Sequence, residues 1–293
     1  MSFSKVLLVA LSITAVDAKP LVPSKVARAE PPEPSPYPLG EACGNEWEYL
    51  NFDPANEADQ RLLRQLHDVI CTGEVRSLAS RGYTAAEEAK TGTNPVFNLF
   101  FDPGEETPVV VSDVLKMIRG DDSSSASFIG AVVGEMVVDN KDFSQDFSCD
   151  DEGELAYTDD DEADGLQKIH FCPIAYEKPN LESIDCGALD SFPSEKMDTF
   201  SRVVLHEITH GENVGPESEL SAQIKDIEND DEGTAYGINR AHALVREKIG
   251  QEVYNADNYA YMSLDAWVSW DCTPADNRDA WASFFPDPPP DYE

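Results

Sequence analysis

Apolar residues recur at helical spacing in several stretches of the chain, which predicts helices there. The first stretch, "EADQRLLRQLHDVICTGEV", is followed at Gly73 by a glycine that suits a helix end. In "EKMDTFSRVVLHEITH", apolar residues fall near one stripe and Gly211 stands where a C-terminal cap belongs. Two further helices are predicted nearer the C-terminus, over "GINRAHALVREKIG" and "NADNYAYMSLDAWVSW", and the second could begin at Asn255 or Asp257.

Other apolar stretches are rich in β-branched residues and predict strands. "SFIGAVVGEMVV" has the pattern of a buried strand, and "ELAYT" and "KIHFCPIAY" predict two more. The acidic segment "DDDEADG" separates the last two, which indicates a hairpin that Cys149 and Cys172 could bridge. Strands first and helices later predict an α+β fold, a small mixed sheet followed by a helical second half.

The ends of the chain differ in composition from its middle. Residues 1–18 combine one lysine, a short apolar run and small residues at Val16 and Ala18, as expected of a cleaved signal peptide. Residues 19–42 are proline-rich and lack periodicity, which predicts a linker or short pro-segment. We therefore expect one globular domain over 43–282 and a proline-rich, acidic tail over 283–293.

Cysteine usage and charge favour an extracellular protein. Six cysteines remain after the expected cleavage, and an even number in a secreted chain predicts three disulfides. The formal net charge of −36 argues against binding to nucleic acid or to anionic membranes. No segment has the apolar length of a membrane span. We expect a secreted monomer.

The stretch "VVLHEITHGENVG" places candidate metal-binding and catalytic residues on one of the predicted helices. Residues four apart share a helix face, so His206 and His210 could bind one metal ion. Imidazole nitrogens bind zinc at about 2.0–2.1 Å, and a catalytic zinc keeps one position for water. Glu207 lies beside this pair, where it could act as the general base on a zinc-activated water. One zinc ion per chain is predicted.

A catalytic zinc needs a third protein ligand, and several acidic residues are available for it. Asn213 and Pro216 occupy the positions that a metzincin fills with glycine and histidine, which excludes that class. Glu228 and Glu232 are nominal candidates, but their segment has a poor helical pattern. An aspartate from a loop fits better, and "IKDIENDDEGTAYG" offers three: Asp226, Asp230 and Asp231.

These motifs resemble those of the aspzincins, the deuterolysin-type and lysine-specific secreted metalloendopeptidases. The resemblance covers roughly residues 140–272 and includes "AYT", "IHFCPIAY" and "NADNYAYMSLDAW". The family's ligand aspartate would fall at Gly233, so the chain is more similar to a fungal subgroup of peptidase-like proteins. There an Ile-x-Asp precedes an Ala-Tyr-Gly by a longer loop.

The resemblance implies a zincin-like fold in which Asp226 is the third ligand, with Asp231 and Asp230 as alternatives. It also implies that Tyr236 donates a hydrogen bond to the developing oxyanion. Lysine-specific relatives carry an acidic residue near the position of Ala260, so strict lysine specificity is not expected.

The sequence thus predicts a secreted zinc endopeptidase that acts on proteins or peptides, with Glu207 and Tyr236 as catalytic residues. The alternative is a zinc-binding antigen or zinc scavenger of the same fold that does not cleave. A binding site alone would not need Glu207, so the intact motif favours catalysis. His67, His170 and His242 are interpreted as structural, and Trp267, Trp270 and Trp281 as core or interface aromatics.

Overall fold

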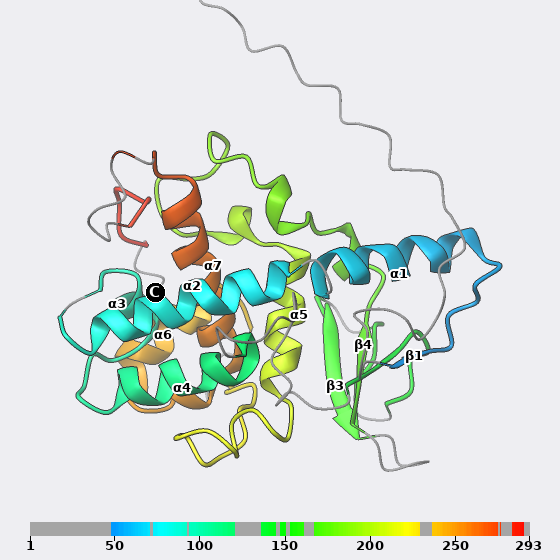
Figure 1. Ribbon diagram of the computed structural model, residues 1–293, viewed down its shortest axis with the longest axis horizontal. Coiled ribbons are helices and arrows are strands. Elements are labelled where there is room, and N and C mark those ends of the chain that lie inside the picture. The colour runs from blue at the N-terminus through cyan, green and yellow to red at the C-terminus, as the bar shows by residue number, and fades with distance from the viewer. Residues whose placement is uncertain are drawn as a thin grey trace, which may run out of the picture. The chain divides into compact units, whose positions relative to one another are not determined.

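A four-stranded mixed sheet and seven α-helices make up the part of the chain that the computed structural model describes (Figure 1). These described residues are 48–70, 73–92, 94–120, 136–144, 147–150, 153–160, 167–228, 236–274, 276 and 283–289. All of them belong to one compact unit, residues 34–293. The predicted signal peptide, the linker of 19–42, and the residues Cys43, Cys71 and Trp281 lie outside the described ranges.

The sheet has the strand order β1-β2-β4-β3. Strands β1 (Glu48–Leu50), β2 (Val137–Asp139) and β4 (Gln167–Phe171) run parallel. Strand β3 (Ala156–Asp160) pairs antiparallel with β4, from Ala156 opposite Phe171 to Asp160 opposite Gln167. Strand β3 therefore forms one edge of the sheet, and β1 forms the other.

The predicted hairpin and its disulfide are confirmed, because β3 pairs with β4 and Cys149 is bonded to Cys172. The second strand is shorter than predicted, since β4 ends at Phe171 and Ala175–Glu177 form a 3-10 turn (η3). Pro173 has no amide hydrogen and cannot continue the ladder. Of the strand predicted over 127–138, only its end is described, as part of β2.

Four helices precede the second strand of the sheet: α1 (Glu57–Ile70), α2 (Glu74–Ala89), α3 (Phe97–Phe100) and α4 (Thr107–Arg119). Helix α1 is confirmed, and Gly73 lies between it and α2 with a φ of 95°. The expected order of strands first and helices later is wrong, because α2 and α4 were not predicted. Both helices bury residues at helical spacing, but the buried face of α2 consists largely of alanine and glycine, and α4 contains three consecutive valines, which are more typical of a strand.

The second half contains α5 (Phe200–Thr209), α6 (Ile238–Glu247) and α7 (Ala256–Asp271), close to the predicted ranges. Two short 3-10 turns, η4 (Leu181–Ser183) and η5 (Glu195–Met197), precede α5, and a third, η6 (Glu252–Tyr254), lies between α6 and α7. The predicted α+β class, a small mixed sheet with a helical second half that carries the His-Glu-x-x-His helix, is confirmed.

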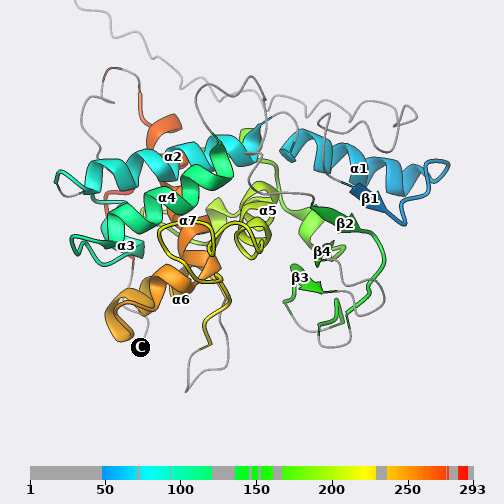
Figure 2. The same cartoon turned by 60° about the horizontal axis from the view of Figure 1, so that its bottom comes forward.

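Helix α5 lies between the sheet on one side and α2, α4 and α7 on the other in both ribbon views (Figures 1 and 2). It contacts α7, α2, α1 and β3. All ten of its residues are buried, so the single apolar stripe expected from the sequence underestimates its burial. This central place puts His206 and Glu207 in the interior of the protein, beside the edge strand.

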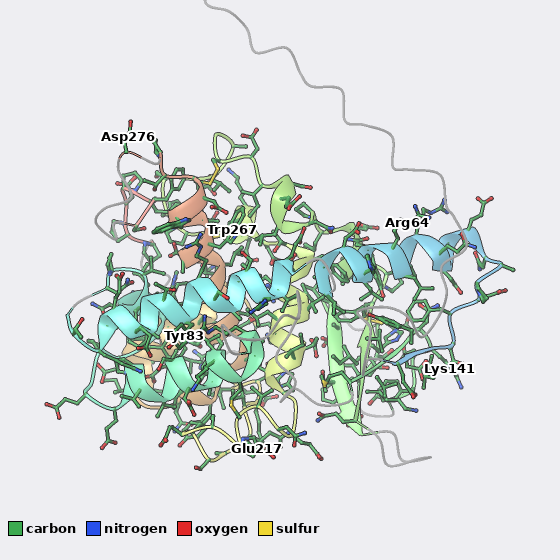
Figure 3. The ribbon with its side chains drawn as sticks, viewed as in Figure 1. Arg64, Tyr83, Lys141, Glu217, Trp267 and Asp276 are labelled. Carbon is green, nitrogen blue, oxygen red and sulfur yellow. A yellow bond between two sulfur atoms is a disulfide. The ribbon has the colours of Figure 1, made fainter. Side chains whose placement is uncertain are left out.

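No helix in the described ranges is both long and apolar enough to cross a membrane. A second disulfide, between Cys186 and Cys272, joins the segment after η4 to the end of α7. Two of the three predicted disulfides are thus present among the described residues. Trp267 packs against the core (Figure 3). The guanidinium of Arg81 lies 4.2 Å from the ring centre of Trp270.

Candidate metal centre

Helix α5 begins at Phe200 because the side chain of Thr199 accepts a hydrogen bond from the backbone N–H of Arg202. This cap explains why the helix starts later than the apolar pattern predicted. The helix ends at Thr209, with His210 as its C-terminal cap residue. A Cβ on Gly211 would lie 3.1 Å from the carbonyl oxygen of Ile208, so a larger residue fits poorly after the histidine.

His206 and His210 direct their Nε2 atoms at each other, 3.3 Å apart. The Nδ1 atom of His206 is 2.7 Å from Oδ1 of Asp257, and that of His210 is 3.1 Å from the carbonyl oxygen of Ile224. A carboxylate and a carbonyl can only accept, so both Nδ1 atoms carry the proton. With the proton on Nδ1, each imidazole in its neutral form would present its Nε2 lone pair to the same point, as metal-binding histidines do.

Asp226 completes a group of three. Its Oδ1 lies 3.2 Å from Nε2 of His206, and its Oδ2 lies 3.4 Å from Nε2 of His210. Asp226 was the aspartate favoured from the sequence; the alternatives Asp230 and Asp231, like Glu232, fall outside the described residues. Glu228 lines the neighbouring cavity but is not part of the three-residue group.

Backbone hydrogen bonds on both sides of Asp226 hold it in place. The N–H of Lys225 donates to the carbonyl of Tyr254, and the carbonyl of Lys225 accepts from Ala256. On the other side, the N–H of Ile227 donates to Oδ1 of Asn255 at 2.9 Å. The Asn-Ala-Asp start of α7 therefore fixes the segment that carries the third candidate ligand.

The spacing of these atoms fits zinc. Ligands at about 2.0–2.1 Å from a tetrahedral metal lie about 3.3–3.4 Å from one another. Here the two Nε2 atoms are 3.3 Å apart, and each faces one oxygen of Asp226, Oδ1 at 3.2 Å from His206 and Oδ2 at 3.4 Å from His210. In addition, Oδ1 of Asp226 is buried and has no hydrogen-bond partner among the described residues. Two imidazoles and one carboxylate are also a ligand set that zinc accepts.

The two histidines and Asp226 shift one another's pKa values by electrostatic attraction. Burial acts to lower the pKa of His206, but the carboxylates of Asp257 and Asp226 outweigh it and raise that pKa well above its usual value. The pKa of His210 is raised against its burial by Asp226 in the same way. Burial would raise the pKa of Asp226, but the two imidazoles lower it. A cation bound here would replace imidazole protons, so its binding should release protons.

Glu207 projects beside the three-residue group. Its Oε2 accepts a hydrogen bond of 2.7 Å from the hydroxyl of Thr158 on the edge strand β3, and its Oε1 is 3.9 Å from Nε2 of His206. Burial raises the pKa of this carboxyl. The arrangement leaves Oε1 as the oxygen available for proton transfer, next to the candidate ligands.

Tyr236 lies across from Glu207. Its hydroxyl is 3.4 Å from Oδ2 of Asp226, and its ring centre is 6.0 Å from that of His206. The residue is 44% exposed, so its hydroxyl borders open space as well as the metal group. Burial and the nearby carboxylate of Asp226 raise its pKa, which keeps the phenol protonated and able to donate.

Two cavities open on either side of this group. One of about 500 Å³ borders β3 and the Asp226 segment, and one of about 320 Å³ borders the first turns of α5 and α7. Ala156, Glu207 and Tyr236 line both. Glu154, in the smaller cavity, has its pKa raised to about 7 by burial and by the charges of Glu207 and Asp226. An extended chain could therefore pass across Glu207 with space on both sides.

A second group, Cys149, His170 and Cys172, also has ligand atoms close together. Its two cysteines form a disulfide and cannot supply thiolates. His170 hydrogen-bonds the carbonyl of Asp139 through Nδ1, in agreement with the structural role expected for it. His242 packs against Phe100 and lines neither cavity, and His67 lies beside Asp68 on α1.

Two residues that contact the group had no role in the sequence analysis. Thr158 and Asp257 belong to the quoted "AYT" and "NADNYAY" stretches, but nothing in those stretches specifies their partners. Thr158 meets Glu207 from 49 positions away, and Asp257 meets His206 from 51. For Asp257, the available signal was a charged residue at the start of a helix that is otherwise largely apolar.

Comparisons with known proteins give little further information. No protein-family model matches the sequence, and no curated protein matches it. Among solved structures, the fold is similar to a zinc peptidase from Grifola frondosa, with a TM-score of 0.39 and 17% sequence identity. The match covers 65% of this chain and 92% of that one. At this TM-score, any functional assignment depends on the geometry of the site itself.

Proposed function

We propose that the protein is a secreted zinc-dependent endopeptidase. The observation that carries the proposal is the triangle of residues His206, His210 and Asp226: the two Nε2 atoms lie 3.3 Å apart, as neighbouring ligands of one tetrahedral zinc ion do, and the carboxylate of Asp226 has an oxygen 3.2–3.4 Å from each of them. Glu207 adjoins this triangle, and the two cavities provide room for a peptide on each side. The disulfides support an extracellular location, because such bonds persist in oxidising compartments.

His206, His210 and Asp226 would hold the zinc ion, one per chain. When bound, zinc would lower the pKa of a water molecule and polarise the scissile carbonyl. Glu207 accepts a proton from the attacking water at Oε1, while Thr158 holds Oε2. The same carboxyl then gives the proton to the leaving amine nitrogen. The hydroxyl of Tyr236 donates a hydrogen bond to the carbonyl oxygen as negative charge develops on it.

The test is zinc analysis of the purified protein together with digestion of casein by wild type and Glu207→Gln. We expect one zinc per chain in both, and a loss of roughly 10²–10⁴-fold in kcat for the variant, since only the proton acceptor is removed. Chelation should abolish cleavage, and added zinc should restore it.

The matched control is Glu217→Gln, the same change at an exposed carboxylate on the loop between the second histidine and Asp226 (Figure 3). It should cleave at the wild-type rate. Bound zinc with no cleavage by wild type would instead favour the zinc-binding antigen or scavenger. A protein without zinc would contradict both functions.

A further inference from the structure

Asp257, in the first turn of α7, is 1% exposed and accepts three hydrogen bonds from the surroundings of the site. Its Oδ1 is 2.7 Å from Nδ1 of His206 and 3.2 Å from Nη1 of Arg202. Its Oδ2 accepts a bond of 2.6 Å from the backbone N–H of Gly237. One carboxylate therefore contacts a candidate zinc ligand and the residue that follows Tyr236.

Arg202 fixes the position of this carboxylate from the helix that carries His206, one turn earlier. Its Nε and Nη2 atoms hold both oxygens of Asp198 at 2.7 and 3.0 Å, and Lys178 adds an ion pair to Asp198 at 2.8 Å. The guanidinium also lies 4.6 Å from the ring centre of Tyr261. Arg202 is thus immobilised on three sides and presents Nη1 to Asp257.

The turn at Tyr236–Gly237 depends on the same carboxylate. Gly237 has a φ of 97°, a conformation that L side chains rarely adopt, and its N–H points at Asp257. The next N–H, of Ile238, donates to Oε1 of Glu195 at 3.1 Å. Two carboxylates therefore hold the start of α6, and the one nearer Tyr236 is that of Asp257.

We propose that Asp257, held by Arg202, is a positioning residue that sets the tautomer of His206 and fixes the Tyr236–Gly237 turn over the metal group. The proposal rests on the zinc site proposed above. It assigns to one side chain the orientation of a metal ligand on α5 and of the oxyanion donor in the segment before α6.

An amide at position 257 cannot replace both functions. If its nitrogen faced His206, Nδ1 of the imidazole would have to accept, and Nε2 would carry the proton that prevents metal binding. If its oxygen faced His206, its NH₂ group would meet the N–H of Gly237, and the turn would be released. Arg202 retains both bonds to Asp198 in either case, so its charge stays paired.

The experiment compares Asp257→Asn with Asp265→Asn, the same change at a second buried aspartate of α7 that lines neither cavity. Zinc dissociation constants are measured by chelator competition, and the visible spectrum of the Co²⁺-loaded protein reports the ligand geometry. For Asp257→Asn we expect a dissociation constant raised 10–100-fold and an altered cobalt spectrum. Asp265→Asn should match wild type in both.

Arg202→Lys provides a second variant, which keeps the charge but cannot bridge two carboxylates. We expect a smaller, few-fold loss of zinc affinity and a cobalt spectrum between the other two. Wild-type affinity and spectrum in Asp257→Asn would overturn the proposal.

Because these measurements do not use turnover, they separate the two proposals. If zinc binds and Asp257→Asn weakens it while wild type does not cleave peptides, only the peptidase function fails.

Discussion

The first turn of α7 and the middle of the same helix both bury polar side chains, but they satisfy them to different extents. In the first turn, Asn255 accepts from Ile227 and donates to Asn258, which in turn donates to the carbonyls of Phe100 and Ala241. Together with Asp257, these residues connect α7 to four other segments: α3, α5, α6 and the segment that carries Asp226. The polar side chains of Asn255, Asp257 and Asn258 all have hydrogen-bond partners, with donors facing acceptors.

Eight residues later, Asp265 accepts a bond of 3.0 Å from the Ser269 hydroxyl at one oxygen. Its other oxygen and the hydroxyl of Ser263 have no hydrogen-bond partner among the described residues. Burial raises the pKa of Asp265 to about 7. The start of the helix thus organises the site, whereas its middle carries polar groups that reduce stability.

Asn255→Leu tests the first turn of α7 and should have the largest effect. Leucine has a side-chain volume similar to that of asparagine but no polar atoms. It leaves the N–H of Ile227 without its acceptor and frees the segment that carries Asp226. We expect zinc affinity to fall 10–100-fold and kcat to fall roughly 10²-fold, because a displaced ligand misplaces the reacting groups. Equilibrium dialysis and peptide hydrolysis measure the two effects. Unchanged values would show that Asn255 serves only the fold.

Asp265→Asn tests the middle of α7 through the pH dependence of thermal stability. A carboxyl whose folded pKa is raised is ionised more easily in the unfolded chain, so it costs stability increasingly between about pH 4 and pH 7 and constantly above. A shift of about three units corresponds to at most about 4 kcal/mol. We expect the variant to melt roughly 5 °C above wild type at pH 8 and at the same temperature near pH 4. An equal difference in melting temperature at pH 8 and at pH 4 would contradict a raised pKa for Asp265.

Gly82→Ala should have a smaller effect. A Cβ at this position of α2 would lie 2.2 Å from Oγ of Ser263, so the two helices would have to separate or the serine would have to turn. We expect a loss of about 1–3 kcal/mol in the free energy of unfolding. Denaturant titration of Gly82→Ala, Ser263→Ala and the double variant measures the coupling. The double variant should recover most of the lost free energy of unfolding, because it lacks Oγ of Ser263, the atom nearest the new Cβ.

Local patterns predicted several parts of this structure, because the information for them lies within a few residues. The His-Glu-x-x-His spacing identified the helix on which His206 and His210 meet, and the acidic segment between two β-branched runs identified the hairpin. The disulfide between Cys149 and Cys172 followed from that hairpin. Thr199, the cap that sets the true start of α5, could have been read from its position before the apolar run.

Contacts between distant segments could not be read in this way. The sequence offered three aspartates in one loop, and the choice of Asp226 came from a resemblance rather than from spacing. What holds Asp226 beside the histidines is the pairing of its two neighbours, Lys225 and Ile227, with Asn255. The roles of Thr158, Arg202 and Asp257 likewise depend on partners from other elements. Helices α2 and α4 were missed although their buried residues recur at helical spacing, because that face of α2 consists largely of small residues and α4 contains three consecutive valines.

The disulfide between Cys186 and Cys272 closes a loop of 86 positions, and all three candidate ligands, Glu207 and Asp257 lie inside it. The metal group is therefore enclosed in a covalent ring. A single cut of the chain anywhere between these cysteines opens the ring but does not divide the molecule. The two histidines and Asp226 would stay tethered to α7 on either side of such a cut, and the fragments would separate only under reduction. For a protein exposed to other proteases, this bond makes the site resistant to dissociation as well as to unfolding.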